Sequence, residues 1–176
     1  MEAVMGAATG DYTGVQSFRL ETRYLDPSVN AFVGMLGSFS RFNQKLSVGV
    51  EDSIATAHFV SNWGIDMGIV RGRHVWALDL MGSSIGSHLA FSPAFVGEHA
   101  FNDRWSLFHR TTVDLFTKDT VYDLDQGIVW KPWKSVGLSL GYRIFTGKHM
   151  SRNGPRAGLI WHFESPRLPF IFPSLG

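Results

Sequence analysis

Cysteine is absent from this chain of 176 residues. Without a thiol, the protein has no disulfide framework, no thiolate metal site and no cysteine nucleophile. Charge of one sign is also lacking, because 16 basic residues stand against 15 acidic ones and leave a net charge of +1. No basic stripe stands out along the chain, so the composition argues against a nucleic-acid partner.

Long apolar runs are missing as well. No stretch approaches the roughly 18 apolar residues that a transmembrane helix needs. The first five residues, Met-Glu-Ala-Val-Met, do not form a basic region followed by an apolar core. No signal peptide is therefore visible, and an exported protein would be represented here by a mature form or a truncated gene product.

Signatures of cofactor chemistry are also missing. The chain has no glycine-rich phosphate loop after a strand and no nucleophile elbow. Its seven histidines show no metal-ligand spacing, such as a pair at i, i+2 on one strand. The sequence therefore predicts no cofactor and no metal.

Period-two alternation is what the chain has in abundance. In 136–144 one face carries Val, Leu, Leu, Tyr and Ile, whereas the other carries Gly, Ser, Gly and Arg. In 63–69, Trp, Ile, Met and Ile alternate with Gly, Asp and Gly. Alternation of this kind is typical of β-strands with one apolar face.

The pattern predicts an all-β fold, a single closed antiparallel β-barrel of the transmembrane type with about ten strands, eight being possible. The barrel is expected over 15–164, after an N-terminal lead (1–14) and before a proline-rich C-terminal tail (165–176). The predicted strands are 15–25, 30–42, 45–59, 62–71, 74–82, 87–99, 104–117, 120–130, 135–146 and 155–164. Short polar connections such as Asn43-Gln44 and Arg71-Gly72-Arg73 have turn composition.

The alternating sheet can face either way. A soluble, lipocalin-like barrel turns its apolar face inward, where it would bind an apolar ligand, whereas a membrane barrel turns that face to lipid. The small and charged residues of the polar face favour the membrane arrangement, because they suit a narrow interior. The expected lumen network consists of Arg19, Glu21, Arg23, Glu51, Asp66, Asp79, Arg110, Asp114, Asp123, Asp125 and Arg143.

Aromatic residues favour the same arrangement. Trp76, Trp105, Trp130, Trp133 and Trp161 are predicted near one edge of the barrel, and Tyr24, Trp63 and Tyr122 near the other. Two such belts mark the membrane interfaces. The lumen charges are interpreted chiefly as salt bridges that fill the interior, with a very narrow cation-preferring channel as the alternative.

With these features the chain resembles small bacterial outer-membrane barrels as a class. Gly141-Tyr142-Arg143 and a last strand ending at Phe163 are similar to the penultimate and terminal strands of that class. The resemblance implies residence in the bacterial outer membrane, with lipid and lipopolysaccharide as partners. Lys148, Arg152 and Arg156 are the candidates for lipopolysaccharide phosphates. The sequence does not predict an oligomeric state.

A second resemblance is to the lipid A 3-O-deacylases, eight-stranded outer-membrane esterases. It rests on His149-Met150-Ser151-Arg152-Asn153 and implies His149 as base and Ser151 as nucleophile. Phe163 stands where that family has an acid, so Asp119 or Asp123 would have to orient the histidine.

Three functions remain open from the sequence. The first is a non-enzymatic outer-membrane barrel that is structural, an interaction platform or a very narrow channel. The second is a lipid A-modifying esterase that uses His149 and Ser151. The third is a soluble barrel with an apolar ligand.

Overall fold

Alternating residues give the chain its strands, and strand pairing curls them into a tube. The structure, a computed structural model, describes residues 2–8, 15–26, 28–50, 53–133 and 136–162. Ten strands follow one another: β1 (Glu2–Ala8), β2 (Val15–Asp26), β3 (Ala31–Val50), β4 (Ser53–Arg71), β5 (His74–Ile85), β6 (His88–Ala100), β7 (Trp105–Leu115), β8 (Thr120–Trp133), β9 (Val136–Gly147) and β10 (Met150–His162).

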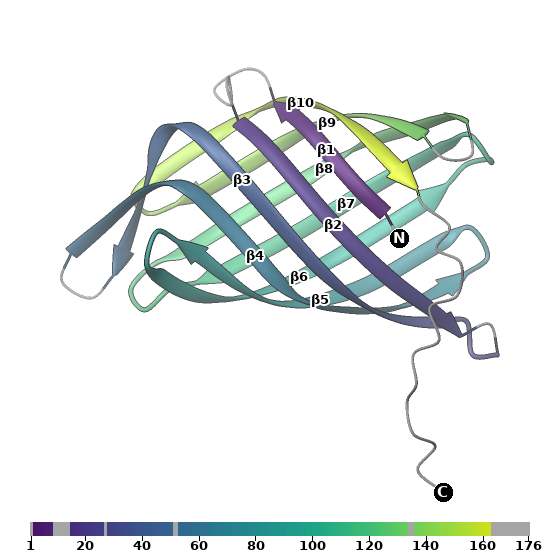
Figure 1. The fold of residues 1–176 in the computed structure, drawn as a ribbon, viewed down its shortest axis with the longest axis horizontal. Coiled ribbons are helices and arrows are strands. Elements are labelled where there is room, and N and C mark those ends of the chain that lie inside the picture. The colour runs from purple at the N-terminus through teal and green to yellow at the C-terminus, as the bar shows by residue number, and fades with distance from the viewer. Residues whose placement is uncertain (1, 9–14, 27, 51–52, 134–135, 163–176) are drawn as a thin grey trace, which may run out of the picture.

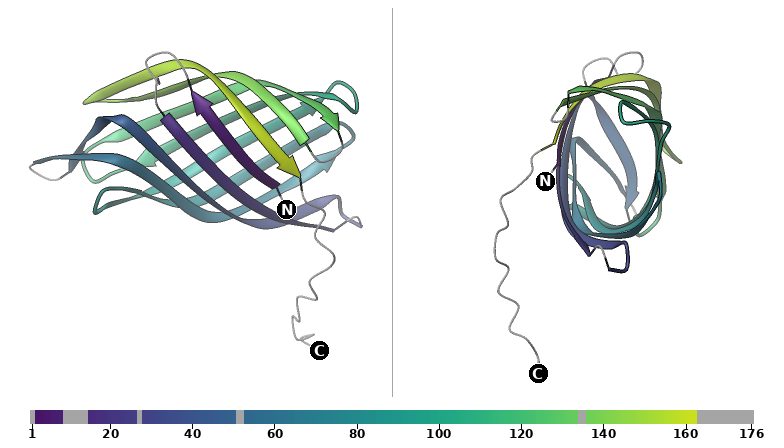
Figure 2. Two further views of the ribbon diagram at one scale, coloured as in Figure 1. Left: turned by 45° about the horizontal axis from the view of Figure 1, so that its top comes forward. Right: turned by 90° about the vertical axis from the view of Figure 1, so that its right-hand side faces the viewer.

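Each strand pairs antiparallel with the next, and β1 pairs with both β2 and β10. The strands therefore run around a closed ring, which is seen end-on in Figure 2. Closure pairs the backbone N–H and C=O groups of edge strands that would otherwise be exposed. The prediction of an all-β antiparallel fold is confirmed.

The ring has two distinct ends. The short-turn end carries the turns 28–30, 72–73 and 101–104. The hairpin end carries the turns 86–87, 116–119 and 148–149, together with the tips of β3 and β4. These two strands, of 20 and 19 residues, are the longest and extend beyond their neighbours at the left of Figure 1.

Alternation along β9 shows which face points out. Ser139 is 1% exposed, whereas its neighbours Leu138 and Leu140 are 41% and 69% exposed. The same contrast holds for Asp66, fully buried between the exposed Ile65 and Met67. Apolar side chains therefore cover the outside of the ring, and polar ones turn inward.

Several predicted boundaries were wrong, among them the break between the predicted strands 45–59 and 62–71, because β4 runs from Ser53 to Arg71 without interruption. The residues predicted as an N-terminal lead contain β1, whose short, small-residue sequence hides its alternation. The turn predicted at Asn43-Gln44 is not a turn, because β3 continues through it and the register with β4 shifts between Arg41 and Leu46. A polar pair inside a bulge resembles a turn in composition. The tail 165–176 and Glu51 lie outside the described residues.

These errors cancel one another, so that from β5 onward each strand runs in the predicted direction. Trp76, Trp105 and Trp130 therefore lie near the short-turn end, on the edge where they were predicted. Tyr24 was predicted at the opposite edge, but it lies near the short-turn end, because the overlooked β1 reverses the direction of β2. Trp63 lies midway along the long strand β4 and opposite Gly82, three residues before the hairpin end of β5.

Candidate functional site: the lumen and its plug

Charged side chains from β2, β4, β5 and β7 meet inside the ring. Asp66 and Asp79 lie side by side in the β4–β5 register, and both are fully buried. Arg23 Nε lies 2.6 Å from Asp66 Oδ2, and Arg110 Nη2 lies 2.6 Å from Asp79 Oδ2. Each of the two adjacent carboxylates therefore has its own guanidinium partner. Buried charges are stable only when they are paired in this way.

Arg19 joins the two halves of this group. Its Nη2 lies 2.6 Å from Glu21 Oε2 and 3.6 Å from Asp79 Oδ2. Glu21 also pairs with Arg23, which stacks 4.4 Å over the ring of Phe32. The guanidinium groups therefore share carboxylates, forming a network and not separate pairs.

A second group of charges lies on β8, β9 and β10. Arg143 donates from Nε and Nη2 to the two carboxylate oxygens of Asp123, at 2.7 and 2.6 Å. Arg156 pairs with Asp125 and stacks 4.4 Å over the ring of Phe108. The bidentate geometry of the first pair is the strong form of a guanidinium–carboxylate contact.

Between these groups runs a cavity of about 190 Å³. Lys131 and Glu98, which form a looser pair at 3.5 Å, also line it. Its charged lining consists of Arg19, Arg23, Arg110, Lys131, Arg143, Arg156, Glu21, Glu98, Asp123 and Asp125. Asp114 is buried farther toward the hairpin end, beside Ser83 and Ser92.

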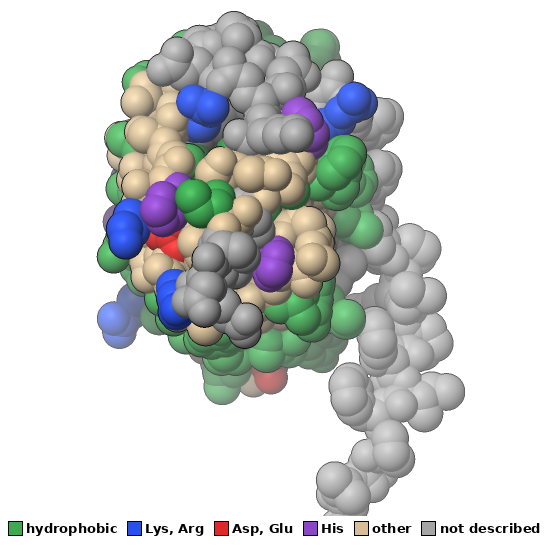
Figure 3. Space-filling view, turned by 90° about the vertical axis from the view of Figure 1, so that its left-hand side faces the viewer, with side chains coloured by type: hydrophobic (Ala, Val, Ile, Leu, Met, Phe, Trp, Pro, Cys, Tyr) green, Lys and Arg blue, Asp and Glu red, His purple; other side chains and the backbone are tan. Residues whose placement is uncertain are grey.

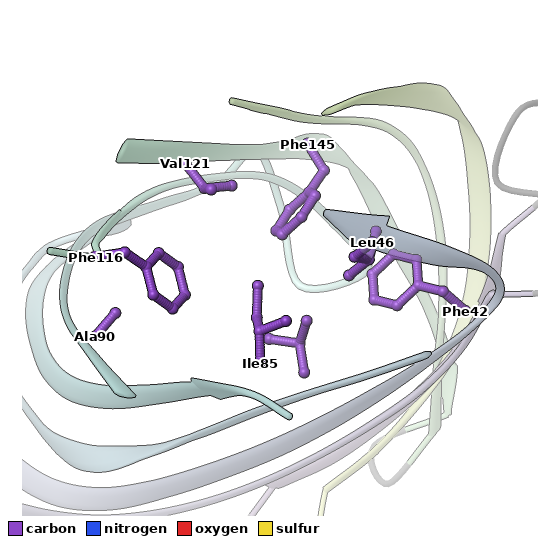
Figure 4. Close-up of a cluster of buried hydrophobic side chains, with 8 residues drawn as sticks. Phe42, Leu46, Ile85, Ala90, Phe116, Val121 and Phe145 are labelled. Atoms are coloured by element: carbon purple, nitrogen blue, oxygen red, sulfur yellow. The ribbon is translucent and has the colours of Figure 1, made fainter. Parts of the chain in front are cut away.

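At the hairpin end the interior changes from ionic to apolar. A cluster of buried apolar side chains, here called the plug, lies inside the strands at this end (Figure 4). Leu46 and Ile85 are fully buried in it, and Phe145 is 1% exposed. The plug consists of Phe42, Leu46, Val60, Ile85, Ala90, Phe116, Val121 and Phe145.

The tip of β3 supplies the centre of the plug. Beyond the register shift after Arg41, the strand bends across the end of the ring and places Leu46 among the other plug residues (Figure 4). Gly49, farther along, donates its backbone N–H to Asp119 Oδ2 at 3.1 Å. Asp119 Oδ1 accepts the backbone N–H of Lys148 at 3.3 Å. One buried carboxylate thus ties the β3–β4 hairpin to the β9–β10 turn.

Most of the predicted lumen residues come together as ion pairs, but the predicted catalytic pair does not. His149 lies in the exposed β9–β10 turn, and Ser151 is exposed on β10. Among the described residues no hydrogen bond joins these two side chains. Both oxygens of Asp119, the acid considered for orienting His149, accept backbone N–H groups.

The three residues predicted to contact lipopolysaccharide fall in different places. Lys148 is exposed in the β9–β10 turn, and Arg152 follows on β10. Arg156, the third candidate, lies on β10, and its side chain points inward and pairs with Asp125 instead of lying at the surface. Viewed toward the hairpin end, Lys, Arg and His side chains gather on the surface in Figure 3.

Sequence reasoning missed the plug, although one signal was present. Phe116 has the parity of an inward residue, which conflicts with a purely polar interior, and in the structure it is 7% exposed within the plug. Leu46 gave no such signal, because its inward position depends on the bulge. In the part of the chain that the structure describes, no group of three His, Asp or Glu residues is placed to hold a metal ion.

A helix long and apolar enough to cross a membrane is not found among the described residues. No protein-family model matches the sequence, and no curated protein matches it.

Solved structures match in fold. The NanC porin superimposes with a TM-score of 0.51 at 7% identity, over 92% of this chain and 99% of that chain. OmpT of Vibrio cholerae gives 0.45 at 10% identity, over 87% of this chain, which spans little more than half (57%) of that protein. The translocator domain of the autotransporter NalP from Neisseria meningitidis gives 0.46 at 14% identity, over 85% and 66%. At such identities the likeness is one of fold, and the fold is that of bacterial outer-membrane β-barrels.

Proposed function

We propose that the protein is an outer-membrane β-barrel whose lumen is held shut, a structural barrel or very narrow channel and not an open pore. Its ten strands would cross the bilayer with their apolar faces toward the acyl chains. The ionic network would fill the middle of the lumen, and the plug would close the hairpin end.

The exposed apolar surface supports the membrane part of this proposal. Leu140, Met35 and Trp63 are at least 60% exposed, and they belong to a surface of apolar residues that runs around the ring. A soluble monomer rarely exposes a contiguous apolar patch larger than a few hundred Å². In a bilayer the same apolar surface would contact acyl chains. A closed barrel pairs its backbone N–H and C=O groups, and this is the form in which strands can cross a membrane.

The lumen argues against the soluble alternative. A barrel that binds an apolar ligand needs an apolar, enclosed cavity. Here ten of the 22 residues that line the cavity are charged, and the buried side chains of the apolar plug pack against one another.

The surface of the hairpin end supports lipopolysaccharide as a partner. Lys118, Lys148 and Arg152 lie there, and Asp119 is the one carboxylate in the described turns of this end. Because Asp119 is buried and accepts two backbone N–H groups, its charge is turned away from the surface. Exposed cations with few carboxylates nearby suit phosphate groups.

The proposal that the lumen is closed rests on the plug, and measurements of ion conductance test this proposal. Purified barrels inserted into planar bilayers are expected to give few and small current steps. Phe42→Ala combined with Leu46→Ala should increase the frequency of steps, because these changes empty the centre of the plug. Leu140→Ala, which truncates a side chain on the outer face, should leave the current unchanged.

Heat-modifiable migration on gels would show that each variant is folded. A folded wild-type barrel that already conducts as often as the plug variant would contradict the proposal.

A further inference from the structure

Two histidines that are far apart in sequence face each other on the outer surface of the short-turn end. His74 opens β5 and His99 lies near the end of β6, and the two are directly opposite in the strand register. Their Nδ1 atoms are 3.2 Å apart, and their ring centroids are 4.4 Å apart.

The strand ladder explains why the rings meet. The N–H of Ala100 donates to the carbonyl of Arg73 at 2.8 Å, so residues 73 and 100 form a hydrogen-bonded pair. In an antiparallel ladder the next pair is non-hydrogen-bonded, and its side chains approach most closely. His74 and His99 occupy this next pair.

Aromatic neighbours hold the two rings in place. His74 stacks on Trp76, with centroids 6.3 Å apart and planes inclined by 4°. His99 meets the ring of Phe101 edge-on at 5.1 Å. A pair held by packing loses little conformational freedom when it binds a ligand.

We propose that His74 and His99 form a bidentate site for a divalent transition-metal ion of the Zn²⁺ or Cu²⁺ class. Two Zn–N bonds of roughly 2.0–2.1 Å at a tetrahedral angle place the nitrogens about 3.3 Å apart, close to the spacing in this pair. In the metal-free pair, one Nδ1–H donates to the other Nδ1. Metal binding moves that proton to Nε2 of the same ring, so both Nδ1 atoms coordinate and no net proton is released.

The surroundings define the class of ion. In the part of the chain that is described, no third His, Asp or Glu completes the pair, so water fills the other positions. Arg71 lies opposite His74 in the β4–β5 register, and Arg73 donates to the carbonyl of Phe101. Positive charge with no carboxylate excludes Ca²⁺ and Mg²⁺, which need oxygen ligands, and leaves ions with high affinity for imidazole.

Calorimetric titration of the folded barrel in detergent, without a polyhistidine tag, tests the site. Zn²⁺ and Cu²⁺ should each bind at one ion per barrel, and this binding should require both histidine rings. Ca²⁺ should not bind. His74→Gln and His99→Gln should each weaken Zn²⁺ binding by about tenfold or more, because one ligand is lost. His88→Gln, at the opposite end of β6, should leave the affinity unchanged.

Electron paramagnetic resonance of the Cu²⁺-loaded barrel gives a second readout, in which two coordinated imidazoles are expected. Zn²⁺ affinity in the wild type equal to that of the variant carrying both substitutions would overturn the proposal. That result would mean that the two histidines form only a hydrogen bond with each other. Since this result concerns the outer rim, it is independent of whether the lumen conducts.

Discussion

Gly49 and Asp119 are 70 positions apart in sequence, yet the backbone N–H of Gly49 lies 3.1 Å from the carboxylate oxygen Oδ2 of Asp119. The other oxygen accepts the N–H of Lys148. Both contacts are hydrogen bonds to a charged acceptor, each of which is worth roughly 1.5–3 kcal/mol when buried. This carboxylate therefore helps to hold the β3–β4 hairpin over the lumen.

Replacing Asp119 by Ala should loosen the hairpin. The variant is expected to fold, because the ring of strands does not depend on this side chain, but to open more often in planar-bilayer recordings. Lys148→Ala is the matched control, since it keeps the backbone N–H that Asp119 accepts. Equal opening frequencies in the wild type and Asp119→Ala would show that the hairpin is held by the plug alone.

The buried charges should differ from the peripheral ones in their effect on stability. Asp79→Asn removes the charge that faces Arg110 and Arg19. Breaking a buried pair in this way should lower the free energy of unfolding by about 3–5 kcal/mol. Lys131→Ala, which breaks the half-exposed pair with Glu98, should cost only about 0–1 kcal/mol. Urea unfolding followed by tryptophan emission measures both, and similar losses would argue against a buried network.

Two glycines offer a contrast in strand packing. A Cβ at Gly64 would lie 2.1 Å from the carbonyl oxygen of Leu80, a backbone atom that cannot move without breaking the β4–β5 pairing. Gly64→Ala should therefore reduce the yield of folded barrel on gels. At Gly37 the nearest atom is 3.9 Å away, so Gly37→Ala should change stability by no more than about 0.5 kcal/mol. Normal folding of Gly64→Ala would refute the close approach of these two strands.

These contrasts show where sequence reasoning succeeds. The alternation in 136–144 correctly predicts β9, because each residue reports its own face and no distant contact is needed. The interior charges follow from the same parity, so Asp66 and Asp79 could be placed inward before their arginine partners were known. Local periodicity is therefore enough to predict the fold class and most of the residues that face the lumen.

Long-range geometry is what the sequence hides. The inward bend of β3 begins at a bulge whose polar residues resemble a turn, so Leu46 could not be assigned to the plug. The meeting of His74 with His99 depends on the β5–β6 register and leaves no spacing signal. Arg156 lies within the predicted strand 155–164, but its partner Asp125 is on β8, two strands away, and the sequence does not show that pairing.

The arrangement of His149 and Ser151 predicts a negative result for ester hydrolysis. Cells that express the wild type and cells that express Ser151→Ala should carry the same lipid A acylation pattern by mass spectrometry. The reason is that Ser151 is exposed on β10 and is not hydrogen-bonded to the histidine. Loss of an acyl chain with the wild type, abolished in Ser151→Ala, would establish the esterase instead.

Spin labelling measures whether the apolar face of the ring points outward to lipid, on which the membrane arrangement depends. Because the chain has no cysteine, Leu140→Cys and Ser139→Cys can each carry one label in barrels reconstituted into lipid. The label at 140 should be accessible to oxygen dissolved in the bilayer and protected from a water-soluble nickel relaxant. The label at 139, inside the barrel, should show little access to oxygen. The reverse pattern, with the label at 140 immobilised and shielded from lipid, would mean that the apolar face points into the ring.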